Sequence, residues 1–185
     1  MLLITLLALS GSLAVAPVDT TANGVTFLST ITVGGQPLVL NGIALRKKAI
    51  FKVYEAGLYV ATKSNDAGAI LAADAPRRMV LGFLRDVGKD KMCEAWDDAL
   101  KDNSPDASAQ LKTDFTTLCG FMADIKEHEQ MVFTYVPGTG SEISVAGVVK
   151  GTIAGKEFAD ALLMAWIGPK PGPGEGFKSN ILGNK

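Results

Sequence analysis

The stretch PLVLNGIALRKKAIFKVYEAGLYVA, residues 37–61, decides how this chain folds. It contains two runs of β-branched, aromatic and other apolar residues on either side of the basic pair Lys47-Lys48. Such runs favour β-strands, and a charged pair between them favours an exposed turn. We therefore predict two adjacent antiparallel strands, over residues 37–46 and 49–61.

Two polar side chains in this stretch are candidate ligand-binding residues. Arg46 ends the first predicted strand, and Tyr54 lies in the second. Burying a guanidinium among apolar residues is unfavourable unless an anion or hydrogen-bond acceptor meets it. A guanidinium beside a phenol can hold a carboxylate or an enolate through charge-assisted hydrogen bonds. The alternative is a solvated strand-end arginine with a tyrosine packed in the core. Tyr59 is five residues beyond Tyr54 and faces the other side of a regular strand, where we expect packing.

The overall composition limits the possible functions. A chain of 185 residues with 48% hydrophobic and 20% charged residues fits one well-packed domain. Its net charge is −1 with basic residues scattered, which argues against nucleic acid as a partner. The sequence contains no P-loop, GxGxxG, GxSxG, HExxH or CxxC motif, so we expect no cofactor and no metal site. His128, the single histidine, sits in the charged run KEHEQ and is expected at the surface.

The rest of the chain alternates between strand and helix patterns. Apolar residues that alternate with a period of two, or that form uninterrupted runs, predict further strands over residues 25–33, 78–87, 131–136 and 141–149. Apolar residues at spacings of three and four predict helices over residues 66–73, 89–102, 106–122 and 156–167. Strands, then helices, then strands and a helix predict an α+β fold with helices on one face of an antiparallel sheet.

The first residues predict export. Residues 1–16 form an uncharged apolar run that ends in the A-x-A match Ala14-Val15-Ala16, as in a signal peptide. We assign residues 1–22 to this peptide, with cleavage after Ala14 or Ala22 left open, and residues 23–185 to a single domain in the periplasm or outside the cell. The alternative is a buried helix or membrane anchor, but the run is shorter than the ~20 residues needed to span a bilayer. We expect no stable membrane insertion after cleavage.

Cys93 and Cys119 are the only two cysteines. An even count in an exported protein is compatible with one disulfide, and both residues fall in predicted helices. A bridge requires these helices to pack with the two Cα atoms within ~7 Å. Two buried free thiols are the alternative.

Four separated segments resemble the chalcone isomerase-like family, in particular its exported bacterial branch. They are GIALRKKAIFKVYEAGLYVA (42–61), VLGFLRDV (80–87), FADALLMAWIGPKP (158–171) and FKSNILG (177–183). The resemblance covers residues 25–183. It implies an open-faced β-sandwich, in which a large antiparallel sheet is backed by a helical layer with a ligand cleft between them.

The resemblance also implies roles for individual residues. In the plant isomerases and the related fatty-acid-binding proteins, an arginine before the first turn and a threonine or tyrosine in the next strand line the polar end of the cleft, and Arg46 and Tyr54 match these positions. The enzymes further use a tyrosine, an asparagine and a hydroxyl residue, where this chain has Lys91, Asp98 and Ala165. Flavanone ring closure is therefore not expected.

These observations predict a non-catalytic, exported protein that binds a small amphipathic acid such as a fatty acid. Arg46 would pair with the carboxylate, Tyr54 would hydrogen-bond it, and Phe83 and Trp166 would enclose the tail. Two alternatives stay open: an isomerase that stabilises the enolate of a chalcone-like enone through Arg46, and a structural or partner-binding protein with a filled cleft. The ligand and the oligomeric state are not predicted.

Overall fold

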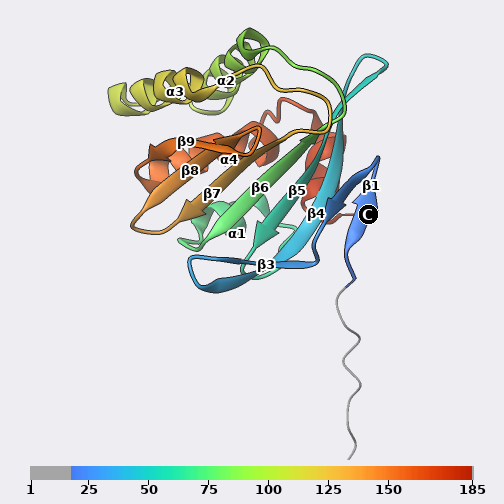
Figure 1. Ribbon diagram of the computed structural model, residues 1–185. Helices are drawn as coiled ribbons and strands as arrows, with labels where there is room; N and C mark the ends of the chain where they lie inside the picture. The colour runs from blue at the N-terminus through green and yellow to red at the C-terminus, as the bar shows by residue number, and fades with distance from the viewer. Residues whose placement is uncertain (1–17, 185) are drawn as a thin grey trace, which may run out of the picture.

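The stretch at residues 37–61 forms the two longest strands of the protein, β4 (Gln36–Lys48) and β5 (Phe51–Val60). They pair antiparallel, with Arg46 opposite Tyr54. The computed structural model describes residues 18–184. Within these residues, β4 and β5 belong to a seven-stranded antiparallel sheet of order β3-β4-β5-β6-β7-β8-β9 (Figure 1). The predicted α+β architecture is confirmed.

The other elements follow the predicted order closely. The remaining strands of the sheet are β3 (Thr30–Val33), β6 (Arg77–Phe83), β7 (Gln130–Val136), β8 (Gly140–Val145) and β9 (Val148–Ile153). The helices are α1 (Ala67–Ala72), α2 (Lys89–Asn103), α3 (Ala109–Phe121), α4 (Lys156–Ile167) and α5 (Glu175–Ile181). β1 (Thr20–Ala22) and β2 (Val25–Phe27) form a separate two-stranded hairpin outside the large sheet.

The strand predicted over residues 78–87 ends at Phe83, and the turn predicted at Lys47-Lys48 lies at Ala49-Ile50. Two other strand predictions join segments that the structure separates. Residues 25–33 were expected to form one strand, but the chain bends at Leu28-Ser29, so that β2 pairs with β1 and only β3 joins the large sheet. Residues 141–149 likewise divide into β8 and β9 at a turn through Ala146 and Gly147, both with positive φ. Alternating hydrophobicity runs through both breaks and hides them, because each new strand is again half buried.

The β1–β2 hairpin covers the outer face of the sheet because two glycines let it approach. A Cβ on Gly57 would lie 2.5 Å from the Phe27 ring, and a Cβ on Gly82 would lie 2.6 Å from the Val25 side chain. Tyr59, with 3% of its surface exposed, packs in the same outer cluster as Phe27. Tyr59 therefore faces away from Tyr54, as the strand period predicts.

The main core lies between the inner face of the sheet and the helices (Figure 1). The central helix is α4, whose apolar residues are almost all buried. α2 packs against both α4 and α3. Cys93 of α2 and Cys119 of α3 are joined in a disulfide with their Cα atoms 5.2 Å apart. The helix pair that the sequence predicts is thus also cross-linked.

The predicted signal peptide falls mostly on residues 1–17, which lie outside the described residues. β1 begins at Thr20 and pairs with β2. Cleavage after Ala22 would remove β1, whereas cleavage after Ala14 would keep it. In the described part of the chain, no helix combines the length and the apolar character that a bilayer crossing requires.

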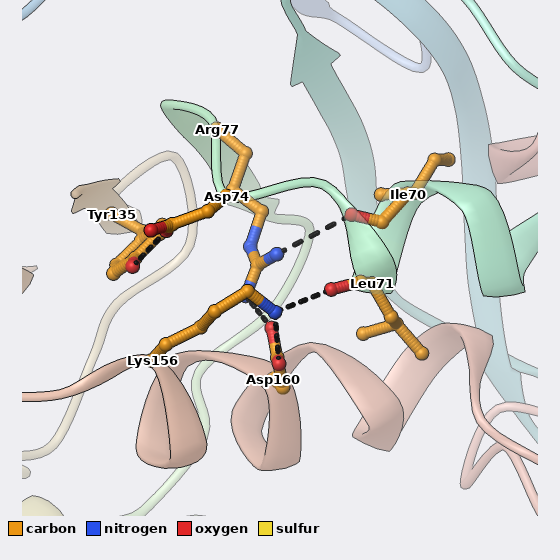
Figure 2. Close-up of polar contacts among 7 residues, drawn as sticks. All are labelled: Ile70, Leu71, Asp74, Arg77, Tyr135, Lys156 and Asp160. Carbon is orange, nitrogen blue, oxygen red and sulfur yellow. Dashed lines mark hydrogen bonds and ion pairs between the residues drawn. The ribbon is translucent and has the colours of Figure 1, made fainter.

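An ion cluster around the buried Arg77, with Asp160 and Lys156 partly exposed, holds α1, β6 and α4 together (Figure 2). Arg77, only 5% exposed, donates to the carboxylate of Asp160, and Lys156 donates to the same carboxylate from the first turn of α4. The two cations also donate to the backbone carbonyls of Ile70 and Leu71 at the end of α1. Because each charge has a partner, the cluster satisfies groups that would otherwise be costly to bury.

Asp160→Ala is expected to destabilise the fold by about 3–5 kcal/mol, because it leaves the buried Arg77 without its counter-charge. Urea unfolding followed by circular dichroism measures the change. Asp98→Ala, which removes an exposed carboxylate from α2, is the matched control and should stay within about 0.5 kcal/mol of the parent. Equal stability of the two variants would contradict the role given to the cluster.

Candidate ligand cavity

A cavity of about 180 Å³ lies between the sheet and the helical layer. It is bounded by β4, β5, β6 and β7 on the sheet side and by α2, α4 and the loop after α4 on the other. Its lining residues are Arg46, Lys48, Val53, Tyr54, Leu81, Phe83, Val87, Lys91, Met92, Ala95, Trp96, Ala99, Met131, Ala165, Trp166, Gly172 and Pro173. All four residues predicted to bind a ligand, Arg46, Tyr54, Phe83 and Trp166, are therefore brought together around one space.

The cavity is apolar inside and basic at its mouth. Its deep walls are buried apolar side chains, such as Phe83, Met131 and Trp166. The charged residues in the lining are Arg46, Lys48 and Lys91, all of them basic. Lys48 and Lys91 are exposed and Arg46 is half buried, so the cations mark the solvent side. Lys91 is paired with Glu94 at 2.7 Å, so within the described part of the chain the free positive charge at the mouth comes from Arg46 and Lys48. The cavity thus combines a positive entrance with a hydrophobic interior.

Arg46 and Tyr54 are cross-strand neighbours in the β4–β5 ladder, which places both side chains on the inner face. The Arg46 Nη1 donates to the carbonyl oxygen of Gly172 at 2.5 Å. A guanidinium has five N–H donors, and within residues 18–184 this is the only side-chain hydrogen bond that Arg46 makes. No carboxylate in that part of the chain pairs with it. Arg46 therefore retains donors that a bidentate anion can use.

Tyr54 is held in place by Trp166. The indole Nε1 of Trp166 donates to the Tyr54 hydroxyl oxygen at 3.0 Å. Burial raises the pKa of Tyr54 to about 12, although the Trp166 hydrogen bond and the charge of Arg46 both act to lower it. The phenol is therefore neutral at physiological pH. Its oxygen accepts from Trp166, and its hydrogen has no acceptor among the described residues, so it can donate to a ligand oxygen.

Four aromatic side chains line the cavity: Tyr54, Phe83, Trp96 and Trp166. The rings of Tyr54 and Phe83 lie 5.7 Å apart, as do those of Trp96 and Trp166. Trp96 is buried, and its Nε1–H has no hydrogen-bond partner in the structure of residues 18–184. An unpartnered buried donor is unfavourable by about 1–3 kcal/mol. A ligand oxygen that reached it would recover part of that free energy.

Several residues that line the cavity, Lys48 among them, were not predicted from the sequence to bind a ligand. Lys48 is two residues after Arg46, and this spacing indicates that both side chains lie on the same face of the strand. Of the three positions at which the plant enzymes carry polar groups, Lys91 and Ala165 line the cavity, whereas Asp98 is exposed on α2 and does not. No cluster of three or more potential metal ligands occurs in the described residues.

Fold and cavity together define an open-faced β-sandwich with an internal cavity under its helices. The chain belongs to the chalcone isomerase-like family, whose model matches residues 19–183. A search of curated proteins found no match. Among solved structures, the chain is similar to the crystal structure of a fatty-acid binding protein from Arabidopsis thaliana. The two share 19% sequence identity with a TM-score of 0.63, over 90% of this chain and 96% of the other. This likeness supports the fold.

The raised pKa of Tyr54 predicts a dependence of stability on alkaline pH. An unfolded tyrosine loses its proton near pH 10, whereas folded Tyr54 keeps it up to about pH 12. The stabilisation from the neutral phenol is therefore complete below pH 10 and is lost as the pH rises to 12, at up to about 1.4 kcal/mol per pH unit. Burial likewise raises the pKa of Tyr59 and of Tyr135 to about 12, and both remain in the variant, so Tyr54→Phe should reduce the slope of the curve in this window without abolishing it. Parallel curves of unfolding free energy for parent and variant between pH 10 and 12 would contradict the prediction.

Proposed function

We propose that the protein is an exported, non-catalytic binding protein for a small amphipathic acid of the fatty-acid type. The acid lies in the cavity with its tail among the aromatic rings. Its carboxylate lies at the basic mouth, where Arg46 forms an ion pair and Tyr54 donates a hydrogen bond.

The observation that carries this proposal is the separation of charge and apolar surface in one cavity. Each charged lining residue is a cation near solvent, and the interior is formed by apolar side chains. An anion with a hydrocarbon tail matches this arrangement, because the charge remains at the mouth while the tail leaves water. A neutral polar ligand would leave Arg46 without a counter-charge, and a cation would be repelled.

The volume of the cavity indicates how much of a tail it holds. An engineered cavity of about 150 Å³ in another protein binds benzene, so about 180 Å³ suits roughly six to eight carbons. Burying six methylenes contributes about 5 kcal/mol before association entropy is subtracted, at about 0.8 kcal/mol for each. Acids of six to ten carbons are therefore the best probes. The Arabidopsis relative, described as a fatty-acid binding protein, supports the same ligand class.

Two features favour binding over catalysis. Ala165 stands where the plant isomerases carry a hydroxyl residue, and it lines the cavity without offering a polar group. Asp98, which corresponds to a polar position of those enzymes, is outside the cavity. The cavity therefore lacks groups that ring closure of a chalcone uses.

Arg46→Ala is expected to weaken octanoate binding roughly 10- to 100-fold, because a hydrogen bond to a charged group contributes about 1.5–3 kcal/mol. Isothermal titration calorimetry with octanoate and with octanol measures the change. Octanol has the same tail without the charge, so its affinity should be nearly equal in parent and variant.

Lys112→Ala, which removes an exposed cation of α3 outside the cavity, is the matched control and should bind octanoate like the parent. Native mass spectrometry of the purified protein, followed by extraction, identifies any acid that copurifies. An Arg46→Ala variant that keeps the octanoate affinity of the parent would exclude Arg46 from the binding site. A parent protein that binds octanol as tightly as octanoate would contradict the preference for an acid.

A further inference from the structure

The β4–β5 hairpin carries an unusual surface next to the cavity mouth. We call residues 47–52, together with Arg85, the hairpin tip. At the turn, Ile50 is 86% exposed and Phe51 is 54% exposed. Four exposed cations surround these two apolar side chains: Lys47, Lys48, Lys52 and Arg85. The Arg85 guanidinium lies over the Phe51 ring, 4.7 Å from its centroid.

The hairpin tip projects beyond its neighbouring strand. β6 pairs with β5 only from Tyr54 onward, so the residues of the tip pair across the hairpin alone. Figure 1 shows this hairpin, in cyan, extending past the rest of the sheet. Ile50 and the exposed part of Phe51, whose ring Arg85 partly covers, are therefore available to a surface beyond the tip.

The charge of the tip is almost entirely positive. Asp86, next to Arg85, is neutralised by Lys126 at 2.9 Å and also accepts from the backbone N–H of Glu127. Lys52 donates to Asn23, which in turn donates to the Glu55 carboxylate, so among the described residues the free cations of the tip are Lys47, Lys48 and Arg85. Lys47 and Lys48 form no ion pair within residues 18–184. Exposed apolar side chains ringed by cations are the composition that binds the interface of an anionic bilayer, where the rings enter the headgroup region and the cations meet phosphate.

We propose that the hairpin tip docks the protein on an anionic phospholipid surface, with Ile50 and Phe51 inserted and Lys47, Lys48 and Arg85 on the headgroups. Lys48 belongs both to the tip and to the cavity lining, so docking places the cavity mouth beside the bilayer. Docking would let an acid pass between the bilayer and the cavity, and this part of the inference rests on the proposed function. The docking itself does not require an occupied cavity.

Co-sedimentation with vesicles tests the docking. The purified protein should bind vesicles of phosphatidylglycerol and phosphatidylethanolamine at 50 mM salt, bind phosphatidylcholine vesicles at least tenfold more weakly, and lose affinity as salt rises. The double variant Ile50→Asp, Phe51→Asp should bind anionic vesicles at least tenfold more weakly. Lys47→Gln should reduce binding about fivefold, because each cation near an anionic surface contributes about 1 kcal/mol.

Leu28→Asp is the matched control, since Leu28 is 52% exposed, like Phe51, but lies far from the tip. The backbone carbonyl of Ser29, next to Leu28, accepts from the N–H of Leu40. Leu40 is ten residues before Ile50 in the chain, so at ~3.3 Å per residue Leu28 lies about 30 Å from the tip. Leu28→Asp should bind vesicles like the parent. Circular dichroism confirms that each variant is folded.

The outcomes separate this inference from the proposed function. Octanoate affinity in solution should be unchanged in the double variant, because neither residue lines the cavity. A parent that does not bind anionic vesicles, or a double variant that binds them like the parent, overturns the docking even when octanoate binds. Equal loss in Leu28→Asp also overturns it, since the effect would then not belong to the tip. Failure of octanoate binding alone overturns the proposed function only.

Discussion

The register of β4 against β5 is the constraint on which the site depends. Arg46 and Tyr54 are opposite each other and face the helices only in this register. A slip by one residue would turn a whole strand over and move its side chains to the outer face. Contacts on both faces oppose such a slip. Phe27 of the outer hairpin lies on Gly57, and the backbone carbonyls of Asn180 and Ile181 at the end of α5 approach Gly42 too closely for any side chain there.

On the inner face of the sheet, two pairs of an arginine and a tyrosine lie on neighbouring strands, and they differ in one respect. Arg77 lies over the ring of Tyr135, and both have carboxylate partners in the protein, Asp160 for the arginine and Asp74 for the tyrosine hydroxyl. That pair is complete and belongs to the framework (Figure 2). Arg46 and Tyr54 have no carboxylate partner among the described residues, and they face a cavity instead. The arginine–tyrosine pair at one end of the inner face thus has its carboxylate partners within the protein, whereas the pair at the other end can accept a carboxylate from a ligand.

Much of this arrangement was predictable from local patterns. The two apolar runs on either side of Lys47-Lys48 predicted adjacent strands that carry Arg46 and Tyr54. Apolar residues spaced by three and four predicted the buried faces of α2 and α4. What was not predictable depends on contacts between residues far apart in the chain. The separation of β2 from β3 reflects the fit of Val25 and Phe27 on two glycines of other strands. The choice between a disulfide and free thiols depended on the packing of α2 against α3. The depth and size of the cavity likewise depend on how aromatic rings from four elements meet.

The cross-link between α2 and α3 has a mechanical consequence for the cavity. α2 supplies Met92, Ala95 and Trp96 to one wall, on both sides of Cys93. The chain enters and leaves this helix pair through two segments that hydrogen-bond to each other at Val87 and Ile125. Because α2 is joined to α3 by the disulfide and the segments that flank the pair are hydrogen-bonded to each other, α2 and α3 are coupled, so that a displacement of α2 would carry α3 with it. A ligand larger than the cavity would therefore have to displace two packed helices rather than α2 alone.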